Sequence, residues 1–179
     1  PRARDAAPED PRLVLAHARL MYRTGKYEAA VTGFELALPK LPTEPAAYAE
    51  WAHACYVVGD RSRALDAARR AEATDLIIAL TGDAPAITEL AQRRPDYLPA
   101  RVALAEQAIR ARRFADARAI CEPLEPVAPV TTTLAEALYG EGRALHEAGQ
   151  PAAARPLLER ALQLHPRSPQ AAAARALLE

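Results

Sequence analysis

Apolar residues recur every three or four positions along most of the chain, with charged residues between them. This spacing predicts amphipathic helices, each with one buried stripe. The first two stripes comprise Leu13, Leu20 and Met21, then Val31, Phe34 and Leu38. Half of the residues are apolar, but only 5% are aromatic and Ala dominates. Because Ala favours helices, whereas sheets favour β-branched and aromatic residues, the sequence predicts an all-α fold.

The helical stretches form a repeated pattern around a small residue. A Gly at the end of one stretch is followed five residues later by an Ala, and seven residues after that by a second Ala. Three copies keep this spacing: Gly25, Ala30 and Ala37; Gly59, Ala64 and Ala71; Gly149, Ala154 and Ala161. A fourth has Arg112, Ala117 and Leu124 at these positions. Gly ends a helix because it reaches left-handed backbone angles freely, and each first Ala lets two helices approach closely.

This pattern, 34 residues from Gly25 to Gly59, resembles the tetratricopeptide repeat (TPR). The supporting residues of the first two units are Gly25, Tyr27, Ala30, Phe34, Ala37 and Pro42, then Trp51, Ala52, Gly59, Ala64 and Ala71. Those of the last two are Leu104, Ala105, Phe114, Ala117 and Pro129, then Gly142, Leu145, Gly149, Ala154, Ala161 and Pro166. The resemblance implies an α-solenoid, a right-handed superhelix of antiparallel helix pairs that bury their stripes by stacking. Expected units are 11–44, 45–78, 98–131 and 135–168.

Several segments depart from the repeat. Residues 79–97 are expected to form one irregular extra helix, with Asp83 as its N-cap and Pro95 after it. Pro123 and Pro126 should end a helix early, and Pro156 should delay the start of a helix or kink it. Residues 169–179 read as a capping helix, and residues 1–10 as a linker or disordered N-terminus. Residues 11–179 are otherwise expected to be a single array.

Composition and motifs argue against catalysis and against several classes of ligand. Lys plus Arg and Asp plus Glu both number 23, so the excess positive charge typical of nucleic-acid binding is missing. No apolar run is long enough to span a membrane. Ser62 and Ser168 are expected to be N-caps, His17 a core histidine, and Cys55 and Cys121 buried thiols. We therefore predict no catalytic residue, no metal site and no cofactor.

The resemblance also implies where a ligand would lie. TPR arrays bind partners in a concave groove lined by the first helix of each unit. By position, the groove residues would be Arg19, Tyr22 and Arg23 from the first unit, His53 and Tyr56 from the second, Glu106 and Arg110 from the third, and Tyr139, Arg143 and His146 from the fourth. Tyr and Arg are enriched at binding hot spots. The expected function is a non-catalytic scaffold or adaptor that binds a peptide or partner helix.

Two other functions remain open. The chain could be a self-associating structural solenoid, and so a homo-oligomer, or an accessory domain of a larger enzyme or of an envelope or secretion assembly. The sequence begins at Pro1, which is consistent with a fragment of a longer chain. A soluble protein is expected, cytoplasmic or periplasmic if the source is bacterial, and the compartment itself stays open.

Overall fold

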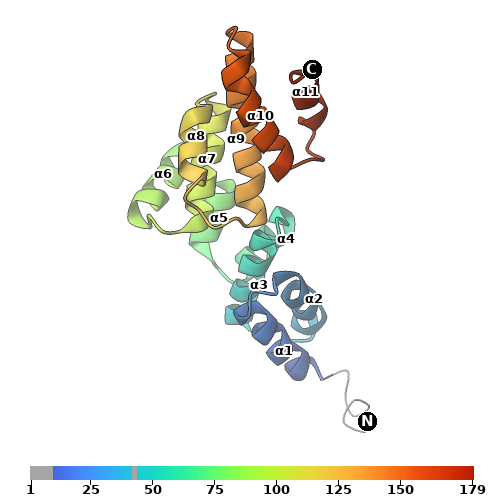
Figure 1. Cartoon of the computed structure of the whole chain (residues 1–179). Coiled ribbons are helices and arrows are strands. Elements are labelled where there is room, and N and C mark those ends of the chain that lie inside the picture. The colour runs from blue at the N-terminus through green and yellow to red at the C-terminus, as the bar shows by residue number, and fades with distance from the viewer. Residues whose placement is uncertain (1–9, 42–43) are drawn as a thin grey trace, which may run out of the picture. The chain divides into compact units, whose positions relative to one another are not determined.

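The computed structural model describes residues 10–41 and 44–179, which form eleven α-helices, one short 3-10 helix and no β-strand. The chain divides into two compact units, one ending at Leu80 and the other beginning at Thr81. Successive helices pair through short turns in both units (Figure 1). The predicted all-α fold of helix pairs is confirmed. The expected linker at 1–10 falls, apart from Asp10, outside the described residues, as does Pro42.

The first unit contains two helix pairs and a further helix. Its elements are α1 (Pro11–Arg23), α2 (Tyr27–Ala37), the 3-10 helix η1 (Leu38–Lys40), α3 (Pro45–Val57), α4 (Arg61–Arg70) and α5 (Thr74–Thr81), whose last residue belongs to the second unit. Helix α1 packs on α2, α2 on α3, and α3 on α4. Asp10 caps α1, because its side chain accepts a hydrogen bond from the Arg12 backbone nitrogen.

The second unit contains a single helix, two pairs and a short terminal helix. Its elements are α6 (Ala84–Arg93), α7 (Leu98–Arg110), α8 (Phe114–Cys121), α9 (Ala128–Glu147), α10 (Pro151–Leu164) and α11 (Ala171–Ala176). Helix α9 packs on both α8 and α10, and α11 folds back beside α10 (Figure 1). Residues 128–131, placed by the sequence pattern at the end of unit 98–131, instead form the first turn of α9, where Pro129 is readily accommodated.

The turns within the pairs confirm the role expected of glycine. Gly25, Gly59 and Gly149 have φ angles of 73°, 89° and 74°. In each turn the Gly amide and the next amide bond back to carbonyls of the last helical turn, which is the hydrogen-bond pattern of a Schellman C-cap. Arg112 forms the same turn with φ of 58°, although it carries a β-carbon. The turn geometry therefore persists without glycine, at a conformational cost.

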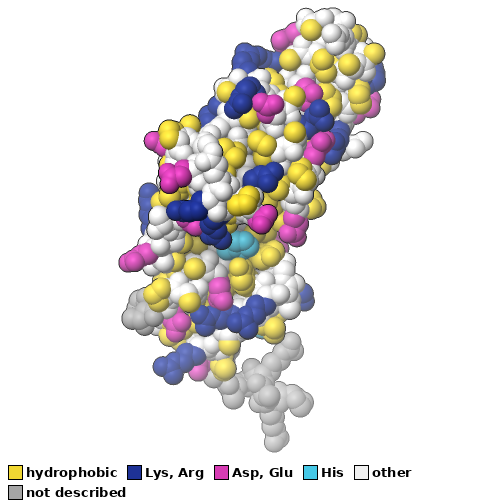
Figure 2. All heavy atoms as spheres, turned by 90° about the vertical axis from the view of Figure 1, so that its left-hand side faces the viewer, with side chains coloured by type: hydrophobic (Ala, Val, Ile, Leu, Met, Phe, Trp, Pro, Cys, Tyr) yellow, Lys and Arg dark blue, Asp and Glu magenta, His cyan; other side chains and the backbone are white. Residues whose placement is uncertain are grey.

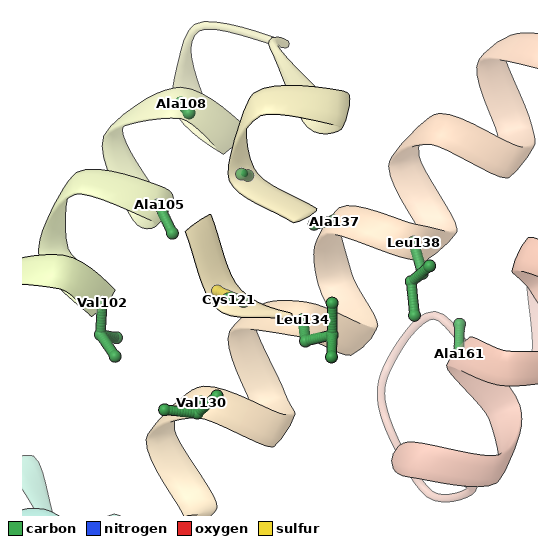
Figure 3. Close-up of a cluster of buried hydrophobic side chains, with 10 residues drawn as sticks. Val102, Ala105, Ala108, Cys121, Val130, Leu134, Ala137, Leu138 and Ala161 are labelled. Carbon is green, nitrogen blue, oxygen red and sulfur yellow. The ribbon is translucent and has the colours of Figure 1, made fainter. Parts of the chain in front are cut away.

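Close packing around small residues is also confirmed. Ala30, Ala64, Ala117 and Ala154 are at most 1% exposed. In the second unit, buried residues of α7, α8, α9 and α10 form one apolar cluster in which Ala105, Ala108 and Ala137 lie among larger side chains (Figure 3). The interior is thus built from small side chains that let helices approach, with a few Leu, Val and Cys side chains filling the remaining space.

Some sequence predictions require correction. Leu13 and Leu20 are 61% and 54% exposed, because α1 buries Leu15 and Ala18 instead. His17, expected in the core, is exposed for the same reason. Helix α10 begins at Pro151 and continues through Pro156, so the expected late start is wrong.

The expected capping residues are partly corrected as well. Ser62 lies inside α4, which is capped by Asp60, and Ser168 precedes α11 by more than one position, so neither serine is an N-cap. Residues 79–97 contain one whole helix, α6, after the end of α5, so the extra helix is shorter than the segment. Asp83 caps α6 as predicted, through a 2.9 Å bond from the Ala86 amide, and α8 ends at Cys121 before Pro123.

Candidate partner-binding surface

The first unit places Arg19, Tyr22 and His53 together, on α1 and α3. The Arg19 guanidinium lies 2.8 Å from a carboxylate oxygen of Glu50 and 3.6 Å from one of Glu44. Both acids come from outside α1, so these ion pairs hold Arg19 against the next helix pair. Since the Arg19 side chain is only 31% exposed, it is partly committed to internal contacts.

Tyr22, Tyr27 and His53 form a compact aromatic cluster. Their ring centroids are 5.7 to 6.1 Å apart, in edge-to-face arrangements. The Tyr22 hydroxyl lies 3.2 Å from His53 Nδ1 and can donate to that nitrogen while it is unprotonated. Burial lowers the pKa of His53, and burial, together with Tyr27 and Glu50, raises the pKa of Tyr22. Both side chains are therefore uncharged near neutral pH.

Two other expected groove residues, which lie in the first compact unit, differ in exposure. Arg23 lies at the exposed C-terminal end of α1. Tyr56 is only 2% exposed, so the expectation that its ring contacts a ligand is corrected. The repeat pattern marks this position as facing the groove, but the Tyr56 side chain turns into the core of α3 and its neighbours.

In the second unit, Tyr139 is the best-placed expected residue. Its partly exposed ring packs against two apolar clusters, one shared by α7, α8, α9 and α10, and one formed by α10 and α11. Arg143, one turn further along α9, pairs with Glu147 at 3.2 Å, and both side chains are well exposed. Arg110 is exposed at the end of α7, while Glu106 and His146 are half-buried.

Two hollows flank Tyr139. One, of about 230 Å³, lies between α9, α10 and α11 and has Ala135, Ala161, Ala171 and Ala174 in its wall. The other, of about 360 Å³, lies between α7, the α7–α8 turn and α9, and is lined by Arg110, Arg112 and Arg143 among others. Tyr139, Glu136 and Gln170 belong to both hollows. The second unit thus presents an apolar recess and an arginine-rich recess next to each other.

The sequence did not indicate the α11 side of this surface. Gln170 and the turn after α10 line the apolar recess only because α11 folds back on α10. The alanines of 171–176 signal a helix, but they do not specify which neighbour the helix covers.

An ion-pair network links α8, α9 and α10 away from these recesses. Arg118 contacts Glu141 at 2.7 Å and Glu122 at 3.4 Å, and Arg160 contacts Glu122 at 2.7 Å. Arg160 and Arg118 lower the pKa of Glu122, while the bond to Glu141 raises the pKa of Arg118. Glu141 is therefore engaged in joining α8 to α9.

The charges of the surface are mixed. On the face drawn in Figure 2, Lys and Arg side chains are interspersed with Asp and Glu rather than gathered in one field. Within the described residues, no cluster of three or more His, Cys, Asp or Glu side chains has the geometry to hold a metal ion. In the same part of the chain, no helix combines the length and apolarity needed to cross a bilayer.

Consecutive helix pairs with Schellman turns and alanine contacts define the chain as an all-α helical-repeat protein. The family model of the tetratricopeptide repeat matches residues 135–178, which include most of α9 and all of α10 and α11. This segment, which holds Tyr139 and Arg143, is therefore similar to the TPR, a type of repeat that typically mediates protein–protein interaction. No curated protein matches the chain.

Proposed function

We propose that the chain is a non-catalytic module that binds a peptide or a helix of another protein on the first helices of its repeats. The observation that carries the proposal is the position of Tyr139, in the segment that matches the TPR. Its ring is supported by two apolar clusters, yet remains partly exposed between two recesses. A large aromatic side chain that is already ordered makes a good anchor, because little side-chain entropy is lost on binding.

The first unit supplies a second candidate contact area of the same kind. Tyr22 and His53 support each other, and Arg19 is held by Glu50. Arg23 adds an exposed positive charge at the end of α1. On this proposal, the units 11–44, 45–78, 98–131 and 135–168 act as the repeats of the array, and each first helix contributes to binding.

A peptide-display selection with the full chain as bait would test the proposal. Peptides that bind wild-type protein would be synthesised, and their affinities measured by fluorescence anisotropy. Tyr139→Ala should weaken binding by at least about tenfold, as expected for a hot spot. Glu159→Ala, an exposed change on α10, is the matched control and should have little effect. If the selected peptides bind Tyr139→Ala, Tyr22→Ala and wild-type protein equally well, the proposed binding surface is wrong.

A second candidate function, self-association, is favoured by a specific feature of α1. Leu13 and Leu20 precede Ala47 and Ala54 of α3 by 34 residues, and both alanines are fully buried in the first unit, where α3 packs on α2. The same positions of α1 therefore carry exposed leucines on the face by which a helix pair stacks on its neighbour. A second copy of the chain could cover this face.

Light scattering at low micromolar protein would test self-association. A discrete oligomer that becomes monomeric in Leu13→Asp plus Leu20→Asp would support it. Leu36→Asp is the matched control, because Leu36 is 62% exposed and lies on α2 of the same pair. A wild-type protein that is monomeric under these conditions would exclude this function.

A further inference from the structure

The apolar recess beside Tyr139 has the dimensions of a side-chain subsite. Its volume of about 230 Å³ is below the roughly 300–1,000 Å³ typical of small-molecule sites. Four alanines contribute to its wall, so the space arises because small side chains stand where α9, α10 and α11 meet. Such a recess suits one branched or aromatic side chain rather than a whole metabolite.

The neighbouring recess has the opposite character. Arg110 and Arg112 have no ion-pair partner in the described part of the chain, and Arg143 pairs only with exposed Glu147 on its own helix. Exposed pairs of this kind are weak, so Arg143 can exchange Glu147 for a ligand carboxylate. Glu136 is the acidic residue that lines both recesses. Because arginines line only the second recess, where three of them outweigh Glu136, an acidic ligand group is favoured on the arginine side.

We propose that the two recesses together bind a peptide in which an apolar residue adjoins an acidic one. The apolar side chain would occupy the α9–α10–α11 recess. The adjacent carboxylate would contact Arg143 and Arg110, for which planar guanidinium groups are well suited. The Tyr139 ring would lie between the two. This inference rests on the proposed binding function. It specifies the chemistry of the ligand and the part of the chain that binds it.

Two short probes test the proposal with the full ¹⁵N-labelled chain: acetyl-Gly-Leu-Asp-Gly-amide and acetyl-Gly-Asp-Leu-Gly-amide. At least one should shift the backbone amides of Ala135, Tyr139 and Ala171. Replacing Leu by Ala or Asp by Lys in the active probe should reduce its affinity at least about tenfold. If neither probe shifts these amides, or if the altered probes bind as well, the proposal is overturned.

Matched variants localise the effect. Ala171→Met should fill the apolar recess and abolish probe binding, whereas Ala172→Met, on the exposed face of the same helix, should not. Arg143→Gln should weaken the Asp-containing probe at least about fivefold, whereas Arg167→Gln, an exposed arginine outside both recesses, should not. Circular dichroism melting of each variant confirms that it is folded. Equal binding by Ala171→Met and Ala172→Met would contradict the proposal.

The binding function and the subsite assignment can fail separately. If the display-selected peptides need Tyr139 but bind Ala171→Met and Arg143→Gln as well as wild-type protein, the binding function stands and this subsite assignment falls. If the selected peptides bind independently of both Tyr139 and Tyr22, the binding function itself falls.

Discussion

Gly33 of α2 lies directly against Ala18 of α1. A β-carbon at position 33 would come within 2.8 Å of the Ala18 β-carbon and 3.3 Å of its α-carbon. Both residues are buried, and Ala18 has no flexible side-chain end that could move aside. The distance between the two helices is therefore set by the absence of one methyl group.

Gly33→Ala should destabilise the protein in spite of alanine's higher helix propensity. Alanine gains up to about 1 kcal/mol in a helix interior, but overpacking a tight contact typically costs about 1–3 kcal/mol. We expect a net loss of about 1 kcal/mol in the free energy of unfolding, measured by urea denaturation. Thr32→Ala, at an exposed position of the same helix, should be neutral or slightly stabilising. A Gly33→Ala protein as stable as wild type would show that α1 and α2 can separate without cost.

In the α7–α8 and α9–α10 turns, the cost of placing a β-carbon on a residue with positive φ can be measured without a change in packing. Gly149 has φ of 74° and nothing within 4 Å of the place where a β-carbon would stand. Gly149→Ala should thus destabilise by about 1 kcal/mol through backbone strain. Arg112→Gly, at φ of 58°, should change stability in the opposite direction by a similar or smaller amount. Thermal and urea unfolding would measure both, and effects of the same sign would contradict this account.

The sequence predicted the fold better than it predicted the surface. Glycine and alanine spacing identifies turns and close contacts because those depend on local conformation and on the absence of side-chain atoms. It does not identify which face of α1 is buried: Leu13 and Leu20 follow the helical period as well as Leu15 does, and only packing against α2 decides. Likewise, Tyr22 and Tyr56 occupy the same place in the repeat pattern, three residues before Gly25 and Gly59, but Tyr56 is buried whereas Tyr22 is partly exposed.

The two cysteines should react slowly in the folded protein. Both are buried and unpaired, and burial raises the pKa of the Cys55 thiol to about 12 and of the Cys121 thiol to about 11. At pH 8 the reactive thiolate would then be about 10⁻⁴ and 10⁻³ of each, against roughly a quarter for a cysteine with the ordinary pKa of about 8.5. Iodoacetamide labelling followed by mass spectrometry should be at least about 100-fold slower in native protein than in urea. Rapid native labelling would show that these helices open readily.

His53 should make stability depend on pH. Burial lowers its pKa below the usual 6.5, so the unfolded chain binds a proton at a pH where the folded protein still does not. Because the unfolded state then binds more protons, the free energy of unfolding should fall as pH drops below about 6.5, and level off once pH passes the folded pKa. Protonation of Nδ1 would also remove the hydrogen bond from Tyr22.

Urea denaturation between pH 7.5 and pH 5 would test this coupling in wild-type protein and in His53→Gln. The variant retains an acceptor for the Tyr22 hydroxyl but cannot titrate, so its stability should fall less over this range. His17, His146 and His165 are present in both proteins, and the difference between the two curves therefore isolates His53. Parallel curves would mean that His53 titrates equally in the folded and unfolded states, and that the aromatic cluster of Tyr22, Tyr27 and His53 does not exclude water from the imidazole.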